Sequence, residues 1–156
     1  MLQMVIWLRY GLSASIINGD TPTSATRQRE SRQTCIDKFQ SGLGFGAIIM
    51  SPIAAGVGLN VTGANHVIHY SRHWNPAKEN QATDRAYRIG QTLDVHVYYP
   101  MATLSEGRSF DIVLDELLSH KMSLATNTIF PTEKIEVTQD EILHNLFDQT
   151  KGNLGG

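Results

Sequence analysis

The feature that most constrains the fold is a set of four short apolar runs within the first hundred residues. They are SIIN at 15–18, GAIIMS at 46–51, HVIHY at 66–70 and VHVYY at 95–99. Their apolar residues are continuous rather than alternating, which is typical of strands covered on both faces. Strands of this kind form parallel sheets, so we expect a parallel β-sheet.

The interval between the first two runs has the pattern of a helix. Residues 23–42 place Ile36 and Phe39 on one apolar stripe. Thr23 is the expected N-cap, and Gly42 is expected to end the helix.

A second helix is predicted over 75–91, with Pro76 near its start and Gly90 as its end. The order is then strand, helix, strand, turn, strand, helix, strand. This alternation is typical of proteins with a parallel sheet flanked by helices. The predicted fold class is therefore α/β.

After Pro100 the pattern becomes helical only. Apolar residues recur at helical spacing at Phe110, Val113, Leu114, Leu117 and Leu118. TQDEILHNLF repeats this pattern behind Thr138, an expected N-cap, and the segment 130–138 is expected to connect the two helices. We expect an α/β lobe at 1–103 and a helical extension at 104–156.

The opening residues LQMVIWLRYGL also have a helical pattern, and no apolar strand precedes them. A parallel α/β unit normally begins with a strand. We therefore expect the chain to be a fragment of a longer protein, without the first strand of this lobe.

Composition narrows the class of protein. The chain has 156 residues, of which 41% are hydrophobic and 18% charged, as is ordinary for a soluble globular domain. Its single cysteine forms no internal disulfide, and no apolar run approaches the roughly 20 residues of a membrane span. We expect a cytoplasmic, nucleoid-associated location in a bacterium, or a nuclear one in a eukaryote. The net charge of -2 argues against a bulk nucleic-acid coat protein but not against a local basic groove.

Three polar residues share one face of the second predicted helix. At 100° per residue, Gln81, Arg85 and Arg88 fall within about 60° of one another. Two like charges on one ridge cost about a few tenths of a kcal/mol, so they fit best opposite a phosphate, whose oxygens match a guanidinium. The alternative is a solvated face on which Asp84 pairs with Arg88, and the pattern alone leaves both open.

A glycine-rich turn follows the second apolar run. Gly56 and Gly58 would allow a ligand to approach the backbone closely after a parallel strand. The turn fails as a dinucleotide fingerprint because Val61 stands where the third glycine belongs, and the chain contains no P-loop motif.

The histidines and the cysteine do not indicate chemistry of their own. His66 and His69 point to opposite faces of a strand, and neither they nor His73 show the spacing of metal ligands. No metal site is predicted. Cys35 precedes the apolar Ile36 and is expected to be a packed thiol rather than a nucleophile.

The residues from 48 to 91 closely resemble motifs V and VI of the Swi/Snf-like branch of superfamily 2 helicases and DNA translocases. WNP at 74–76, followed by QATDRAYRIGQ at 81–91, carries the resemblance. It extends upstream to IINGDT and RQTCIDKF, which are similar to the motif IV region, and downstream through VHVYYPMA to FDIVLDELLSHKMSLA. The resemblance covers nearly the whole chain. The sequences INGDTP and NPAKENQATDRAYRIGQT are more similar to bacterial members of the family than to nuclear ones.

The resemblance implies the second RecA-like lobe of such a protein, a member of the P-loop NTPase superfamily without its own P-loop. It implies that Arg85 and Arg88 are arginine fingers, with Gln81 as a supporting contact and Gly58 and Asn60 near the nucleotide. ATP and Mg²⁺ would be bound mainly by a missing N-terminal lobe of the same parent chain. The isolated chain is therefore not expected to hydrolyse ATP.

The resemblance also implies contacts with double-stranded DNA. The expected nucleic-acid residues are Thr21, Arg32, Lys38, Ser51 and Trp74. The alternative for Trp74 is a half-buried packing role, and the alternative for the cations is solvation. Whether RNA polymerase, repair proteins or defence proteins are partners stays open.

The predicted function is thus the second lobe of an ATP-dependent double-stranded DNA translocase. The alternative from another class is a non-catalytic nucleic-acid or protein-binding module with a degenerate nucleotide face. A dinucleotide-binding fold is disfavoured by the incomplete glycine pattern.

Overall fold

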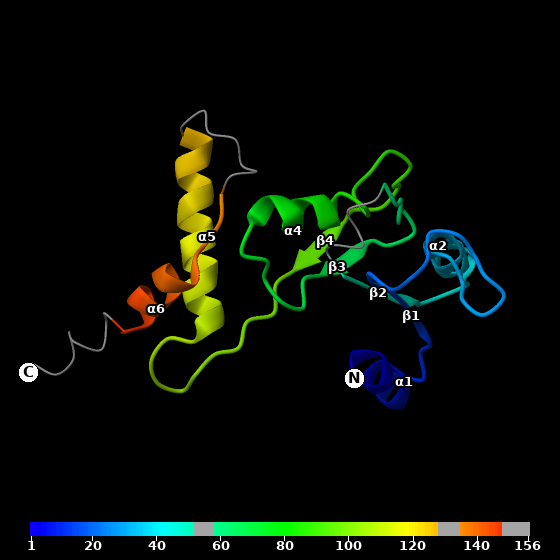
Figure 1. Ribbon diagram of the computed structural model, residues 1–156, viewed down its shortest axis with the longest axis horizontal. Coiled ribbons are helices and arrows are strands. Elements are labelled where there is room, and N and C mark those ends of the chain that lie inside the picture. Colours follow the sequence, from blue (N-terminus) through cyan, green and yellow to red (C-terminus); the bar gives the residue numbers. More distant parts are fainter. Residues whose placement is uncertain (52–57, 128–134, 148–156) are drawn as a thin grey trace, which may run out of the picture. The chain divides into compact units, whose positions relative to one another are not determined.

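The computed structural model describes residues 1–51, 58–127 and 135–147 (Figure 1). The turn expected at Gly56 and most of the expected connector at 130–138 lie outside the described residues. The chain divides into two compact units. The first unit comprises Met1–Val67 and Gln81–His96, and the second comprises Ile68–Asn80 and Val97–Gly156.

The elements alternate as the apolar runs predicted. In chain order they are α1 (Leu2–Tyr10), β1 (Ala14–Ile17), α2 (Arg32–Ser41), β2 (Ala47–Met50), β3 (His66–Ile68), α4 (Pro76–Thr83), β4 (His96–Tyr98), α5 (Phe110–Asn127) and α6 (Gln139–Phe147). All four predicted strands form, each within two residues of its expected bounds.

The strands pair as β1 with β2 and β3 with β4. β1 and β2 run parallel and lie side by side (Figure 1), with Ala14 opposite Ala47 and Ile17 opposite Met50. The Ser51 amide extends this pairing by donating to the Ile17 carbonyl at 2.9 Å. The prediction of a parallel arrangement is confirmed for this pair.

Helix α1 confirms the helical pattern of the opening residues. It ends at Gly11, whose φ of 66° lies in the left-handed region and whose amide donates to the Trp7 carbonyl at 2.9 Å. None of its residues is buried. The described helices include none with the length and apolar character needed to cross a bilayer.

Helix α2 begins later than predicted. Its N-cap is Ser31, whose hydroxyl accepts from the Thr34 amide at 3.1 Å, so the prediction of Thr23 as the cap was wrong. The residues from 24 to 31 offer almost no apolar side chain for packing, whereas Ile36 lies one turn past Ser31 and is fully buried. The helix therefore starts where burial can stabilise it. Gly42 is its C-cap, as predicted.

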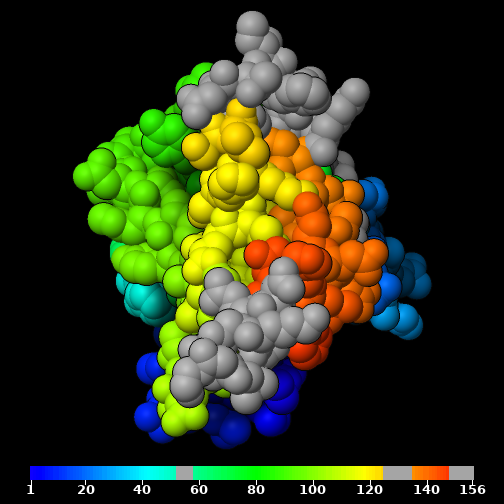
Figure 2. All heavy atoms as spheres, turned by 90° about the vertical axis from the view of Figure 1, so that its left-hand side faces the viewer, coloured from blue at the N-terminus to red at the C-terminus, as the bar shows by residue number. Residues whose placement is uncertain are grey.

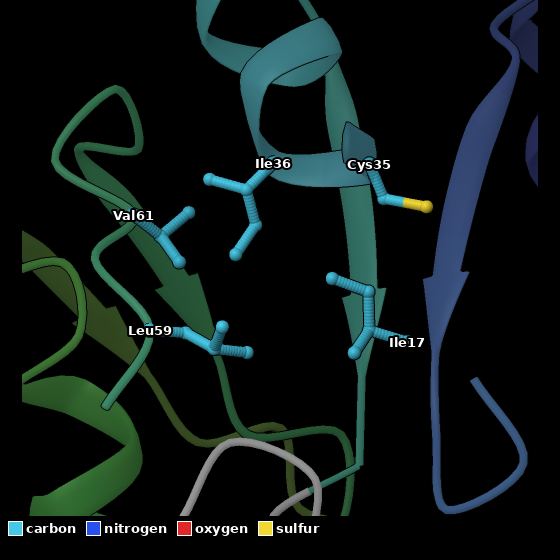
Figure 3. Close-up of a cluster of buried hydrophobic side chains, with 5 residues drawn as sticks. All are labelled: Ile17, Cys35, Ile36, Leu59 and Val61. Atoms are coloured by element: carbon cyan, nitrogen blue, oxygen red, sulfur yellow. The ribbon is translucent and has the colours of Figure 1, made fainter. Parts of the chain in front are cut away.

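The core of the first unit joins a strand, a helix and a loop. Figure 3 shows one buried cluster that is formed by β1, by α2 and by the loop between β2 and β3. Its members are Ile17 of β1, Cys35 and Ile36 of α2, and Leu59 and Val61 of the loop. Burial raises the pKa of the Cys35 thiol, and the negative charge of nearby Glu30 adds to the effect. Cys35 is thus a packed thiol, as expected.

Helix α4 is shorter than predicted. It ends at Thr83 rather than near Gly90, and the chain continues in turns. The Arg85 carbonyl accepts from the Val61 amide at 2.8 Å, so contacts with the preceding loop replace further helical bonds. Ile89, in this turn segment, is fully exposed. Gly90 has a φ of 104° and allows the last turn.

The C-terminal helices form the core of the second unit, as their spacing predicted. Figure 2 shows α5, in yellow, lying against the segment 135–147, in orange and red. The buried cluster between them consists of Val113, Leu114, Leu118, Val137 and Ile142. Leu117 packs against this cluster, as the predicted stripe requires.

Thr138 caps α6 as predicted. Its hydroxyl accepts from the Glu141 amide at 3.3 Å, and the Glu141 carboxylate accepts from the Thr138 amide at 2.8 Å. This reciprocal pair is a capping box. Lys121 of α5 donates to the same carboxylate at 2.8 Å, which ties the two helices together.

Candidate functional site

The predicted arginine ridge lies at and after the end of α4. Gln81 is exposed in the last turn of the helix, whereas Arg85 and Arg88 follow in the turn segment. The three residues therefore do not share one helical face, and this part of the prediction was wrong. The reason is that the helix gives way to contacts with the loop at 58–66.

Arg88 and Asn60 are brought into direct contact. The Arg88 Nη1 donates to the Asn60 Oδ1, and both side chains are exposed. In the part of the chain that the structure describes, no ion pair joins Asp84 to Arg88. The solvated ridge with an Asp84 partner is thus not the arrangement found, because Arg88 turns to the loop instead.

Arg85 is buried, with only 9% of its surface exposed. Its Nε has no hydrogen-bond partner among the described residues. A buried donor without a partner carries a desolvation cost of about 1–3 kcal/mol, more when it is charged. The Arg85 guanidinium is therefore a group whose hydrogen bonding an additional acceptor would complete.

A constrained glycine lies two residues before Asn60. Gly58 has a φ of 52°, a left-handed conformation that disfavours other residues, and the space beside its Cα is open. Leu59 and Val61, on either side of Asn60, are buried in the core of the first unit. Asn60 is thus held between two anchored residues while its own side chain stays exposed.

Gln91 belongs to the site but was not predicted. Its Nε2 lies 2.8 Å from the Ala64 carbonyl, 3.0 Å from the Thr62 carbonyl and 3.3 Å from the Ala86 carbonyl, so its two N–H groups are shared among three acceptors. Its Oε1 accepts from the Leu93 amide at 2.9 Å. The periodicity of a single sequence does not reveal that a side-chain amide binds backbone carbonyls 27 and 29 residues earlier in the chain.

Gln40 contacts the same loop from α2. Its Oε1 accepts from the Gly63 amide at 3.1 Å and from the Thr62 hydroxyl at 3.4 Å. A Cβ added at Gly63 would lie 2.9 Å from the Gln40 Cγ, so this approach requires glycine. Gly63 within VTGANH is the sequence signal that points to a close contact.

A hollow of about 610 Å³ lies beside Arg88 and is lined by residues between Tyr87 and Asp94. A second hollow, of about 250 Å³, lies between α1 and β1 and contains none of the predicted site residues. The first hollow is therefore the one associated with the predicted chemistry.

The residues expected to contact DNA in the first unit have partners within the fold. Arg32 donates from Nε to the Thr21 carbonyl at 2.9 Å, and the Thr21 hydroxyl donates to the Asn18 Oδ1 at 3.1 Å. Lys38 is exposed and forms an ion pair with Glu30. Ser51 is half-buried at the end of β2. Their contact with DNA stays a prediction.

Trp74 belongs to the second unit and packs against its buried cluster. Its ring centroid lies 6.2 Å from that of Phe110, and its carbonyl accepts from the Val137 amide at 3.0 Å. The side chain is half-buried, as the packing alternative requires. Its DNA role is a prediction that this packing does not address.

Arg72 organises a charged network that was not predicted. Its Nε and Nη2 donate to the Glu79 carboxylate at 3.0 and 3.1 Å, and its Nη1 pairs with Asp115 of α5. Its guanidinium lies 4.5 Å from the centre of the Tyr99 ring. Glu79, which belongs to α4, is only 3% exposed, so this network fixes the segment before α4 to both α4 and α5.

The histidines lie in separate surroundings. The His66 ring lies 5.0 Å from that of His96, and His69 stacks on Tyr99 at 4.9 Å. Burial lowers the pKa of His69. Within the described ranges, no three His, Cys, Asp or Glu side chains gather closely enough to hold a metal ion.

Comparison with known proteins places the chain in a family. Residues 2–90 match the family described as the helicase conserved C-terminal domain. The Zorya protein ZorD of Escherichia coli O139:H28 is 53% identical over 131 residues, which are 84% of this chain and 12% of that protein. The putative ATP-dependent helicase/translocase YwqA of Bacillus subtilis is 42% identical over 115 residues, 74% of this chain and 12% of that protein. The chain thus spans about 12% of the length of these relatives.

A solved structure shares the fold. The crystal structure of the C-terminal part of the Fun30 ATPase domain superposes with a TM-score of 0.66 at 23% identity, covering 97% of this chain and 44% of that one. The predicted RecA-like α/β lobe with a C-terminal helical extension is confirmed. Because the family match covers more than half of its residues, the chain belongs to the helicase conserved C-terminal domain family.

Proposed function

We propose that the chain is the second lobe of an ATP-dependent double-stranded DNA translocase. In this proposal, Arg85 and Arg88 contact the phosphates of an ATP molecule held by an N-terminal lobe of the same parent protein. The observation that carries it is the buried Arg85 Nε without a partner among the described residues, beside the loop that contacts Arg88. An anionic acceptor would satisfy the unused donor of Arg85, and the exposed Arg88 is accessible to the same anion.

The chemistry asked of these arginines is electrostatic. A guanidinium placed against the transferring phosphoryl group stabilises the charge of the transition state, and it can be delivered from outside the lobe that holds the nucleotide. Asn60 would orient Arg88, and Gln81 and Gly58 would lie near the nucleotide. Closure of the two lobes would couple hydrolysis to a step along DNA.

The Mg²⁺ that accompanies ATP is assigned to the other lobe. The described residues offer no cluster of three His, Cys, Asp or Glu side chains, and the sequence contains no P-loop. None of the described residues is therefore assigned to Mg²⁺ in this proposal. The chain's own contribution is to neutralise charge, and the chain alone is expected to be inactive.

We also propose contacts with the DNA backbone, made by Thr21, Arg32, Lys38 and Ser51 of the first unit and, separately, by Trp74 of the second unit. Lys38 is the most exposed cation of this set, and hydroxyls and cations of this kind contact phosphates without reading sequence. Replacing Lys38 should weaken DNA binding by the parent protein and reduce its salt dependence.

The deciding experiment is DNA-stimulated ATP hydrolysis by the parent protein, comparing the unaltered protein with Arg88→Ala at saturating ATP and double-stranded DNA. The matched control is Arg9→Ala, which removes an exposed arginine of α1. We expect turnover to collapse with Arg88→Ala while ATP binding is retained. Unchanged turnover would instead favour the second candidate, a non-catalytic nucleic-acid or protein-binding module.

A further inference from the structure

We propose that Gln40 and Gln91 are positioning residues for Arg88. They form what we call the glutamine clamp, two side-chain amides that fix the turn Val61–Ala64 from different parts of the chain. The turn follows directly on Asn60, the hydrogen-bond partner of Arg88. The inference rests on the proposed function, because that function assigns Arg88 to the phosphates.

Gln91 joins the two segments whose side chains meet. Two of its acceptors, the carbonyls of Thr62 and Ala64, lie just after Asn60, and the third, on Ala86, lies two residues before Arg88. One amide group therefore sets the spacing between the loop and the turn segment. Its carbonyl oxygen is engaged by the Leu93 amide, which fixes the orientation of the amide.

Gln40 holds the same turn against α2. It accepts from Gly63 and Thr62, and the close approach at Gly63 leaves no room for a side chain. Backbone bonds complete the arrangement, because the Val61 amide donates to Arg85 at 2.8 Å and the Ala64 amide donates to Val61 at 3.0 Å. The turn is thus tied both to a helix and to the segment that carries the arginines.

Catalysis depends on how accurately Arg88 is placed against the reacting phosphate. A displacement of about 1 Å in a group that contacts the reacting phosphate reduces turnover by about a hundredfold. Neither glutamine needs to touch ATP for this effect, since each acts through the loop that orients Arg88. Removing either amide should lower turnover without weakening the binding of ATP.

The experiment uses the parent protein with Gln91→Met and Gln40→Met, since methionine keeps the length of the side chain and removes its hydrogen bonds. Gln33→Met is the matched control, because Gln33 is an exposed residue of α2 that bonds to Asp37. We expect kcat to fall by about tenfold or more in both clamp variants, with KM for ATP changed by less than about twofold. The control should retain full turnover.

A double-variant comparison separates positioning from simple loss of structure. If Gln91 acts through Arg88, then Gln91→Met should have little further effect on kcat in an Arg88→Lys background. If the two changes multiply, the glutamine acts independently of Arg88 and the inference is wrong.

A third variant keeps the test open if Gln91→Met fails to fold. Gln91→Glu retains the acceptor for Leu93 but loses the amide donor, and only its protonated form can donate to the carbonyls. Its turnover relative to the unaltered protein should rise as the pH is lowered toward the ordinary carboxyl pKa of about 4.3. A ratio independent of pH would overturn the inference.

The outcomes distinguish this inference from the proposed function. If Arg88→Ala leaves turnover unchanged, the proposed function fails. If Arg88→Ala abolishes turnover while both clamp variants keep the kcat of the unaltered protein, only the glutamine clamp fails.

Discussion

Arg88 donates a hydrogen bond to Asn60, which lies 28 residues earlier in the chain. This contact joins the two segments that the family resemblance assigned to one nucleotide site. Because one of the two residues is charged, the bond is of the stronger kind. Its arrangement leads to a prediction that concerns Asn60 itself.

We predict that Asn60→Ala and Asn60→Asp both lower ATP turnover by the parent protein. Alanine releases Arg88 from its orienting partner, whereas aspartate binds the guanidinium more strongly and competes with the phosphates. Asn60→Asp should therefore be the more damaging change, with a loss of about tenfold or more. Steady-state ATP hydrolysis at saturating DNA measures the turnover of each variant. If both variants turn over ATP as fast as the unaltered protein, Asn60 does not orient Arg88.

We predict that Arg85→Met separates stability from activity. Methionine fits a buried position and removes the Nε that has no partner among the described residues, so the parent protein should unfold at the same or a higher temperature. Turnover should nevertheless collapse, because the proposed phosphate contact is lost. Thermal unfolding and ATP hydrolysis are measured on the same preparation. A large drop in unfolding temperature would mean that the Arg85 guanidinium stabilises the fold.

We predict that Gly63→Ala destabilises the first unit by about 1–3 kcal/mol, as overpacking typically does. The new methyl group would meet the Gln40 Cγ at 2.9 Å. Gly19→Ala is the control, since no atom lies within 4 Å of the added carbon there. Adding Gln40→Ala should recover part of the loss, and chemical denaturation measures all four proteins. If adding Gln40→Ala recovers none of the lost stability, the added methyl group does not clash with Gln40.

Much of the architecture could be predicted from the sequence because burial leaves a local pattern. The continuous runs that became β1 and β2 carry their own signal, and so does the stripe that buries Val113 and Leu114. Thr138 was predictable because the capping box with Glu141 is a local motif.

The site was less predictable because long-range contacts decide it. The sequence assigns a helix through Arg88, but the bond from Val61 to the Arg85 carbonyl ends the helix earlier. Gln91 was missed for a related reason, since its three acceptors are backbone carbonyls that no sequence pattern marks. The motifs led to a prediction of which residues form the site, but not of how they are held.

Glu141 gives the helical extension a pH-dependent contribution to stability. The hydrogen bond from Lys121 lowers the pKa of its carboxyl group, and the backbone amide of Thr138 lowers it further. A carboxyl group whose pKa is lowered by folding contributes stability that is fully present above its unfolded pKa, ordinarily about 4.3. That contribution is lost as the pH falls through the folded pKa. The side chain is 38% exposed, so solvent screens part of the effect.

We predict that Glu141→Gln lowers the unfolding temperature at pH 7 and has a smaller effect at pH 4. The variant removes the charge that pairs with Lys121 but keeps a similar shape. Near pH 4, protonation of the unfolded state of the unaltered protein already reduces the stability that this charge contributes. Glu106→Gln, at an exposed position, is the control and should change little at either pH. Unfolding followed by circular dichroism measures the differences. An effect of equal size at both pH values would mean that the charge of Glu141 does not stabilise the contact between α5 and α6.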